Sequence, residues 1–217
     1  MKITTKSRTA VAALALGMLA GVAAVPEAQA QQGFSGKSAG DIMVRARAIG
    51  VIPDEDATTS IGGNVSVSND WVPEIDFSYF VTDNIALELI AATTRHDVSS
   101  SVAGSLGKVS LLPPTLTLQY HFMPKERFSP YVGAGVNYTF FYNEDAPGGG
   151  INSIDYKNSF GWALQAGVDY AVGGNWYVNA DIKKIFLSTD VSINGGAVTA
   201  DVDLDPWIVG FGVGYKF

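Results

Sequence analysis

The sequence lacks cysteine altogether, contains only two histidines in 217 residues, and has charged residues at only 16% of its positions. Without cysteine the chain has no disulfide framework, no cysteine-ligated zinc or iron–sulfur site and no thiol nucleophile. Two histidines leave little for a histidine-based metal or catalytic centre, so we expect no metal and no cofactor. The formal net charge of −7 argues against a nucleic-acid partner, because the phosphate backbone carries the same sign of charge.

Long apolar runs are also scarce, and the one that stands out lies at residues 10–24, between the basic residues Lys2, Lys6 and Arg8 and the motif Ala28-Gln29-Ala30. A basic region, a short apolar region and an A-x-A motif are typical of a secretory signal peptide. We expect cleavage after Ala30, with residues 1–30 removed and residues 31–217 forming one domain. The alternative is a retained membrane anchor, for which the run is shorter than the roughly twenty residues that a spanning helix needs.

Most of the remaining chain alternates between large apolar and small or polar residues, with the two-residue period of a β-strand. In the last segment, Trp207, Phe211 and Tyr215 share one face, while glycines and Lys216 occupy the other. Such segments exceed the five or six residues of a usual soluble strand and match the nine to eleven of a tilted membrane strand. Eight strands are predicted at residues 41–52, 70–81, 85–96, 109–123, 130–142, 158–171, 176–188 and 205–217.

The connections between these strands alternate between short and long. The short ones lie at residues 82–84, 124–129 and 172–175, and the long ones at 53–69, 97–108, 143–157 and 189–204. Short periplasmic turns and long extracellular loops are typical of bacterial outer-membrane barrels. We therefore predict an all-β fold, an eight-stranded antiparallel transmembrane β-barrel in the outer membrane of a Gram-negative bacterium. The alternative, a soluble lipocalin-like calyx, would place apolar residues inside and polar residues outside.

Several stretches resemble the OmpW family of outer-membrane proteins. They are Val44-Arg45-Ala46-Arg47-Ala48-Ile49 with Pro53, Pro113-Pro114-Thr115-Leu116-Thr117-Leu118-Gln119-Tyr120-His121-Phe122, residues 130–138, and the end of the chain from Asp205-Pro206-Trp207 to Phe217. The resemblance covers essentially the whole mature chain. It implies a monomeric barrel with an apolar channel that helps small hydrophobic compounds, such as alkanes and aromatic hydrocarbons, to cross the outer membrane.

The inward faces of the strands predict two layers. The lower layer is a plug of paired charges and hydrogen-bonding groups, since buried charges must be paired. Its members are Arg45, Arg47, Glu74, Asp76, Glu88, Gln119, His121, Asp169, Asp181 and Lys183. The upper layer is an apolar cup able to hold a small hydrophobic molecule. Its members are Ile49, Val51, Val72, Ile90, Leu111, Phe141, Ile185, Leu187 and Ile208. The alternative for the cup is the plain packing of a solid barrel.

Three prolines interrupt two of the predicted strands. Pro73 lies in the second strand, and Pro113 and Pro114 lie in the fourth. Proline cannot donate a ladder hydrogen bond and is rare inside central strands. Because a hydrophobic molecule cannot easily cross a layer of charges, we predict a lateral exit to the bilayer near these prolines. The alternative is that the prolines stand at a strand start and the wall has no opening.

Other features have weaker interpretations. His96, beside Asp97 and Ser99–Ser101, is compatible with a lipid-modifying enzyme, although its spacing forces no nucleophile–base pair and we expect no enzyme. The acidic loop residues are compatible with divalent cations near lipopolysaccharide or with simple solubilisation; they are Asp54, Glu55, Asp56, Asp201, Asp203 and Asp205. Tyr215 and Phe217 resemble the C-terminal signal that the barrel-assembly machinery reads.

These observations predict a barrel that binds small hydrophobic compounds in its outer lumen and aids their passage, with membrane lipid and lipopolysaccharide as its surroundings. Two other classes stay open. One is a structural barrel that acts only through its extracellular loops. The other is a narrow ion-conducting pore, which a disrupted plug would permit.

Overall fold

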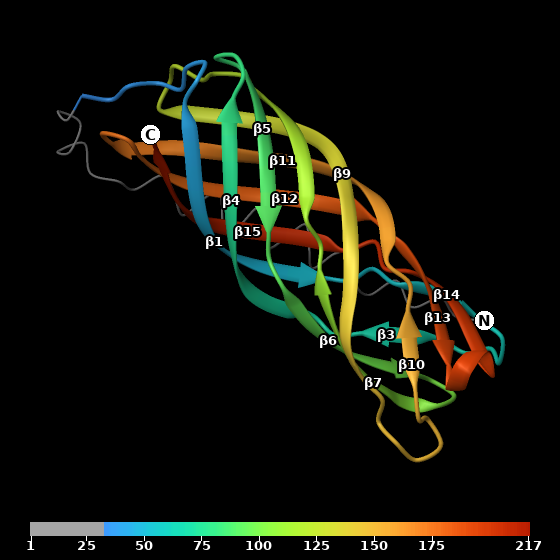
Figure 1. The fold of residues 1–217 in the computed structure, drawn as a ribbon. Helices are drawn as coiled ribbons and strands as arrows, with labels where there is room; N and C mark the ends of the chain where they lie inside the picture. Colours follow the sequence, from blue (N-terminus) through green and yellow to red (C-terminus); the bar gives the residue numbers. More distant parts are fainter. Residues whose placement is uncertain (1–32) are drawn as a thin grey trace, which may run out of the picture.

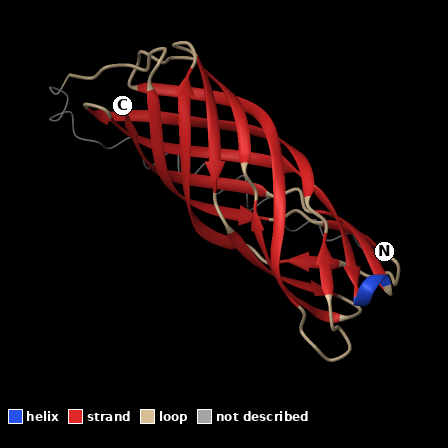
Figure 2. Ribbon diagram, in the orientation of Figure 1, coloured by secondary structure: helices blue, strands red, loops and turns tan. Residues whose placement is uncertain are grey.

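The computed structural model describes residues 33–217, so the predicted signal peptide and its cleavage after Ala30 lie outside the described residues. Eight antiparallel strands close into a barrel in the order β11-β12-β15-β1-β4-β5-β8-β9, and β9 pairs with β11 to complete the ring (Figures 1 and 2). The eight are β1 (Ile42–Ile52), β4 (Asp70–Phe80), β5 (Ile85–Ala91), β8 (Thr115–His121), β9 (Phe128–Asp145), β11 (Ser159–Gly173), β12 (Trp176–Phe186) and β15 (Trp207–Lys216). The predicted fold class is confirmed.

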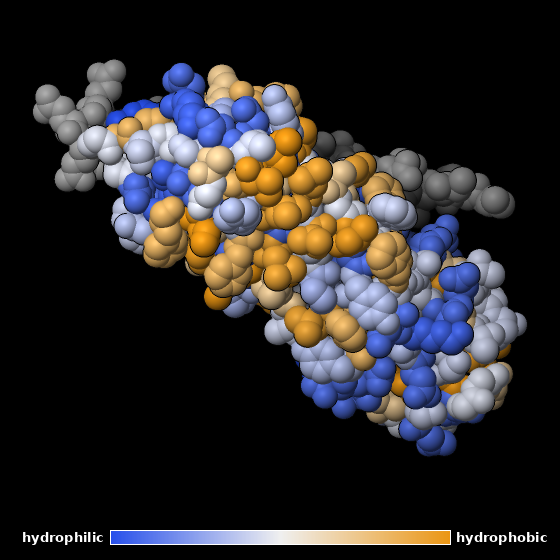
Figure 3. All heavy atoms as spheres, turned by 45° about the horizontal axis from the view of Figure 1, so that its top comes forward, coloured by the Kyte–Doolittle hydropathy of each residue, from blue (hydrophilic) through white to orange (hydrophobic). Residues whose placement is uncertain are grey.

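Alternating residues of these strands point into and out of the barrel, as the two-residue period predicts. In β4, Glu74, Asp76 and Ser78 are buried, whereas Ile75 and Phe77 are about half exposed. Apolar side chains gather over the barrel strands and polar ones over the far extension (Figure 3). Polar inside and apolar outside is the reverse of a soluble calyx and suits a wall that faces lipid. Within residues 33–217, no helix has the length and apolarity needed to cross a membrane.

The long connections contain further strands, which the sequence analysis did not identify. They contain β2 (Asp56–Thr59), β3 (Val65–Val67), β6 (Thr94–Ser100), β7 (Gly104–Leu112), β10 (Ile154–Tyr156), β13 (Ser188–Ile193), β14 (Val198–Asp203) and the short 3₁₀ helix η3 (Asn194–Gly196). β10, β13, β14 and β2 form one sheet. β7 pairs with β9, β6 pairs with β7, and β3 pairs with β6. The wall of the barrel therefore extends beyond the part that faces the membrane (Figure 1).

Two of the predicted strands are in fact interrupted. The predicted strand 85–96 divides into β5 and β6, and the predicted strand 109–123 divides into β7 and β8 at Pro113–Pro114. Across the first break the residues are small or polar, and only the alternation of more buried and more exposed positions continues. Proline lacks the amide hydrogen that the ladder needs, and this accounts for the break between β7 and β8.

The lumen is layered along the barrel axis, and β1 shows all the layers. Met43 lies in a small apolar cluster at the end that carries the short turns, Arg45 and Arg47 lie in the middle, and Ile49 and Val51 belong to the large apolar cluster of the outer half. All five side chains are buried. An ionic layer therefore separates two apolar layers.

Candidate functional site

Two arginines from β1 organise the ionic layer. Arg45 donates to Ser78 Oγ at 2.8 Å and lies 3.5 Å from Asp76 and 3.4 Å from Glu88. Arg47 hydrogen-bonds Glu74 through Nε and Nη2 and donates from Nη1 to Asp181 at 2.7 Å.

These contacts tie β1 to β4, β5 and β12 across the lumen. Charges removed from water need such partners, since an unpaired buried ion costs several kcal/mol.

Neutral polar side chains complete the layer on the opposite wall. Gln165 donates to Asp181 at 2.5 Å, and Gln119 donates to Gln165 at 3.2 Å. His121 Nε2 lies 3.2 Å from the side-chain oxygen Oε1 of Gln119, and Asn179 donates to Asp169 at 2.8 Å. His121 thus lies within the hydrogen-bonded network, as the sequence predicts. Every residue of the predicted plug is buried and faces the lumen.

The sequence interpretation missed Lys37, a charged member of this layer. It precedes the first strand, yet its ammonium is fully buried and contacts Asp169 at 2.7 Å, Ser129 at 2.9 Å and His121 Nδ1 at 3.0 Å. Its backbone amide donates to the Pro124 carbonyl at 2.7 Å, which fixes the segment across the mouth with the short turns. A single lysine in a non-periodic segment carries no sequence signal that would place it inside a barrel.

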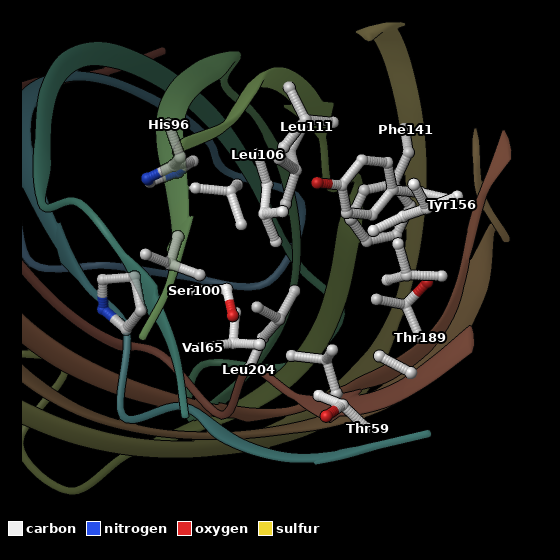
Figure 4. A pocket seen from close by; sticks show the side chains of 18 of the residues that line it. Thr59, Val65, His96, Ser100, Leu106, Leu111, Phe141, Tyr156, Thr189 and Leu204 are labelled. Carbon is white, nitrogen blue, oxygen red and sulfur yellow. The ribbon is translucent and has the colours of Figure 1, made fainter. Parts of the chain in front are cut away.

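Above the ionic layer, two connected cavities occupy the outer lumen. The upper one is walled by the extension strands, with Val65, Leu106, Phe141 and Tyr156 around it (Figure 4). The lower one lies within the barrel and is bounded by Ile49, Ile90, Ile185 and Ile208 with Glu74 and Lys183 below. The residues that line both are Val51, His96, Leu111, Leu187 and Pro206.

Eight of the nine predicted cup residues line one or both cavities. Val72 is the exception, because it packs against the apolar cluster without reaching either cavity. The cup is also deeper than predicted, since extension residues treated as loop contribute half of its wall. Those missed residues include Val65, Val98, Leu106, Tyr156, Val191, Val202 and Leu204. The alternation Thr189, Val191, Ile193 was the signal that could have revealed them.

Aromatic stacking stiffens the upper cavity. The rings of Phe141 and Tyr156 lie parallel, with centroids 5.6 Å apart. Burial, and to a lesser degree the negative charge of Glu144, raise the pKa of the Tyr156 hydroxyl above its ordinary value. Tyr156 therefore stays neutral at physiological pH and presents an apolar ring to the cavity.

The structure places His96 in the cavity wall rather than in an enzyme-like cluster. Its ring nitrogens lie 2.6 Å from the Ser68 carbonyl oxygen and 3.0 Å from Thr94 Oγ1. Both positions are thus engaged by groups other than Ser99–Ser101. His96 fastens the chain before β4 to β6 and forms the boundary between the cavities.

The wall beside the lower cavity has an interrupted hydrogen-bond ladder. β5 pairs with β8 up to Ile90 opposite Thr115, and β6 pairs with β7 from Thr94 opposite Leu111. The register is the same on both sides, so Ala92 falls opposite Pro113 in the unpaired stretch between. Both residues line the lower cavity.

The neighbouring ladder, between β4 and β5, is interrupted as well. β4 and β5 are paired only as far as Ile75 opposite Ala91, and Pro73 lies beyond that point on β4. On its other edge β4 remains paired, with Pro73 opposite Ala48 of β1. Residues 92 and 93 thus lack ladder partners on both sides, and Thr93 instead hydrogen-bonds the Tyr142 hydroxyl. The three prolines lie around this unpaired stretch.

The outer acidic residues include two that are already engaged with a lysine. Lys184 Nζ lies 3.3 Å from Asp54 and donates to the backbone carbonyl of Asp205. Over residues 33–217 there is no group of three or more metal-ligating side chains placed to hold an ion.

Comparison with known proteins decides the family. The model of the OmpW family matches residues 38–217.

The chain belongs to the OmpW family.

An outer-membrane protein of Sinorhizobium fredii, y4mB, is 44% identical over 181 residues, which cover 80% of this chain and 79% of that one. Outer membrane protein W of Escherichia coli is 39% identical over 189 residues, covering 82% and 89%. The crystal structure of OprG from Pseudomonas aeruginosa, 33% identical, superposes with a TM-score of 0.79 over 85% of this chain and 99% of that one. The ionic layer and the cavities described above therefore lie in the lumen of an OmpW-family outer-membrane barrel.

Proposed function

We propose that this barrel binds small hydrophobic compounds in its outer lumen and passes them sideways into the outer membrane. The observation that carries the proposal is the position of the lower cavity, which is apolar, continuous with the upper one and in contact with the unpaired stretch of wall. Apolar cavities with few polar groups are typical sites for hydrophobic ligands.

A lateral route follows from what lies below the cavity. A hydrophobic molecule moving straight toward the periplasm would have to break ion pairs between Arg47 and its carboxylate partners, Glu74 and Asp181. Separating buried ion pairs is strongly unfavourable. At Ala92 and Pro113 the wall has no ladder hydrogen bonds to break, and the bilayer is the apolar phase beyond.

Uptake by living cells tests the proposal. Cells that express the wild type are compared with Leu111→Asp and Ile185→Asp variants at equal outer-membrane amounts of heat-modifiable barrel. A charge in the apolar cup raises the cost of ligand binding, so both variants lose uptake.

An insertion at Gly149 provides the control, because this exposed loop tip lies away from both cavities. Uptake unchanged by the insertion and lost in the cup variants supports transport. Folded wild type that takes up no hydrophobic compound above an empty-vector strain, or a phenotype that follows only the loop insertion, would favour a loop-mediated interaction barrel instead.

A further inference from the structure

The floor of the lower cavity contains an ammonium group that forms no direct hydrogen bond or ion pair with the described residues. Lys183 lies on β12 with its side chain inside the barrel, is only 2% exposed, and borders the lower cavity. Its neighbours across the strand ladders are Gln165 and Ile208. Among the groups that the structure describes, none forms a hydrogen bond or an ion pair with Lys183 Nζ.

The other inward cations are all paired. Lys37 contacts Asp169, Arg45 contacts Asp76 and Glu88, and Arg47 contacts Glu74, Asp76 and Asp181. An unpaired ammonium in a low-dielectric lumen is costly, and an anion that enters the cavity removes that cost.

The carboxylates nearest to Lys183 already accept hydrogen bonds from other side chains. Asp181, the next inward residue on β12, receives hydrogen bonds from Arg47 at 2.7 Å and Gln165 at 2.5 Å. Glu74, which also borders the cavity, is held through Oε1 by two nitrogens of Arg47. Neither comes within 4.0 Å of Lys183 Nζ, so Asp181 attracts the ammonium only at longer range and neither carboxylate contacts it directly.

We propose that the lower cavity selects apolar compounds that carry one carboxylate, with the carboxylate bound by Lys183 and the apolar body against Ile49, Ile90, Ile185 and Ile208. This rests on the proposed function, because it names the substrate class of the same cup. A single ammonium balances one negative charge, which favours a monocarboxylate over a dianionic phosphate. The apolar walls above it favour an aromatic or medium-chain body.

Ligand binding to the barrel in lipid nanodiscs tests the proposal, with empty nanodiscs as the baseline for partition into lipid. The probes are 4-fluorobenzoate and fluorobenzene, followed by ¹⁹F NMR at neutral pH. Wild type is compared with Lys183→Met, which keeps the bulk of the side chain without its charge, and with Lys183→Arg, which keeps the charge.

Lys184→Met provides the matched control. Lys184 is the next residue, but its side chain lies on the outer face, where it contacts Asp54 and lies over the Trp207 ring. Heat modifiability reports folding of each variant, and Lys183→Gln supplies a second uncharged variant.

We expect 4-fluorobenzoate to bind the wild type, Lys183→Arg and Lys184→Met with similar affinity, and the uncharged Lys183 variants about tenfold or more weakly, as the loss of a charge-assisted hydrogen bond predicts. Fluorobenzene should bind all of them alike. Equal 4-fluorobenzoate affinity in wild type and Lys183→Met, with fluorobenzene still bound, overturns carboxylate selection alone. Absence of fluorobenzene binding from every folded variant overturns the proposed cup itself.

Discussion

Lys37 and Asp169 are 132 residues apart in the sequence and form a 2.7 Å ion pair in which neither side chain is exposed. The pair joins the segment before the barrel to the half of β11 that leads to the short turn. Because both charges are buried, the loss of one leaves the other without its counter-ion.

Lys37→Met should therefore destabilise the barrel by about 3–5 kcal/mol, since Asp169 would remain buried with only Asn179 and the more distant Arg45 to stabilise its charge. The denaturant midpoint of the refolded barrel measures the effect. Lys125→Met, which breaks the half-exposed pair with Asp83, is the control and should change the midpoint little. Equal midpoints for wild type and Lys37→Met would show that the buried pair contributes no stability.

Arg47 lies at the centre of the ionic layer, and its removal tests whether this layer blocks ions. Arg47→Ala removes the partner shared by Glu74, Asp76 and Asp181 and vacates the centre of the ionic layer. In planar bilayers we expect a several-fold rise in single-channel conductance with a preference for cations, because the exposed carboxylates attract them. Arg95→Ala, which breaks an exposed outer pair with Asp145, should conduct as the wild type does. Conductance that is equal in both variants would place the ion barrier elsewhere.

A reversible engineered disulfide, called the staple below, tests the lateral exit. The chain has no native cysteine, so Ala92→Cys with Pro113→Cys introduces the only thiols, at positions opposite each other across the unpaired stretch. Facing residues of antiparallel strands lie at separations that a disulfide can span. The oxidised protein should lose hydrophobic uptake and regain it after reduction.

The control for the staple is Ser66→Cys with Ser99→Cys, a paired position between β3 and β6 that lies away from the gap. Its uptake should not respond to oxidation. If the Ala92–Pro113 staple forms fully and uptake continues, the exit is not at this stretch of wall.

Changes at the C-terminal aromatic pair, Tyr215 and Phe217, test whether these residues act as an assembly signal. Tyr215 and Phe217 stack edge to face with ring centroids 4.8 Å apart, and Phe217 is 68% exposed on the outside. Deleting Phe217 should reduce the amount of folded barrel in cells, whereas Phe217→Tyr should not. Refolding in detergent should be nearly unchanged by the deletion, because the exposed ring contributes little burial. An equal loss in cells and in detergent would mean that Phe217 acts on stability rather than on assembly.

The sequence determined the barrel because the membrane imposes a simple rule on each strand. Every second residue faces lipid, so Ile75, Phe77 and Tyr79 are apolar, and the residues between them face the lumen. That rule is local and has a fixed period, so it could be read for β1, β4, β12 and β15 without knowing which strand lies beside which. The lumen-facing positions of Arg45, Arg47 and Asp181 followed from the same period.

Only the tertiary structure decided which groups meet inside the ring. Closure brings Lys37 to Asp169, leaves Lys183 without a direct hydrogen bond or ion pair, and places Ala92 and Pro113 across a stretch without ladder bonds. Periodicity tells on which face a side chain lies, but the pairing of charges depends on strand order, register and the path of non-periodic segments, which are set by contacts between residues far apart in the chain. For the same reason the extension strands were predicted as loops, since their apolar faces acquire a core only when the sheet β10-β13-β14-β2 and the strands β3, β6 and β7 come together above the barrel.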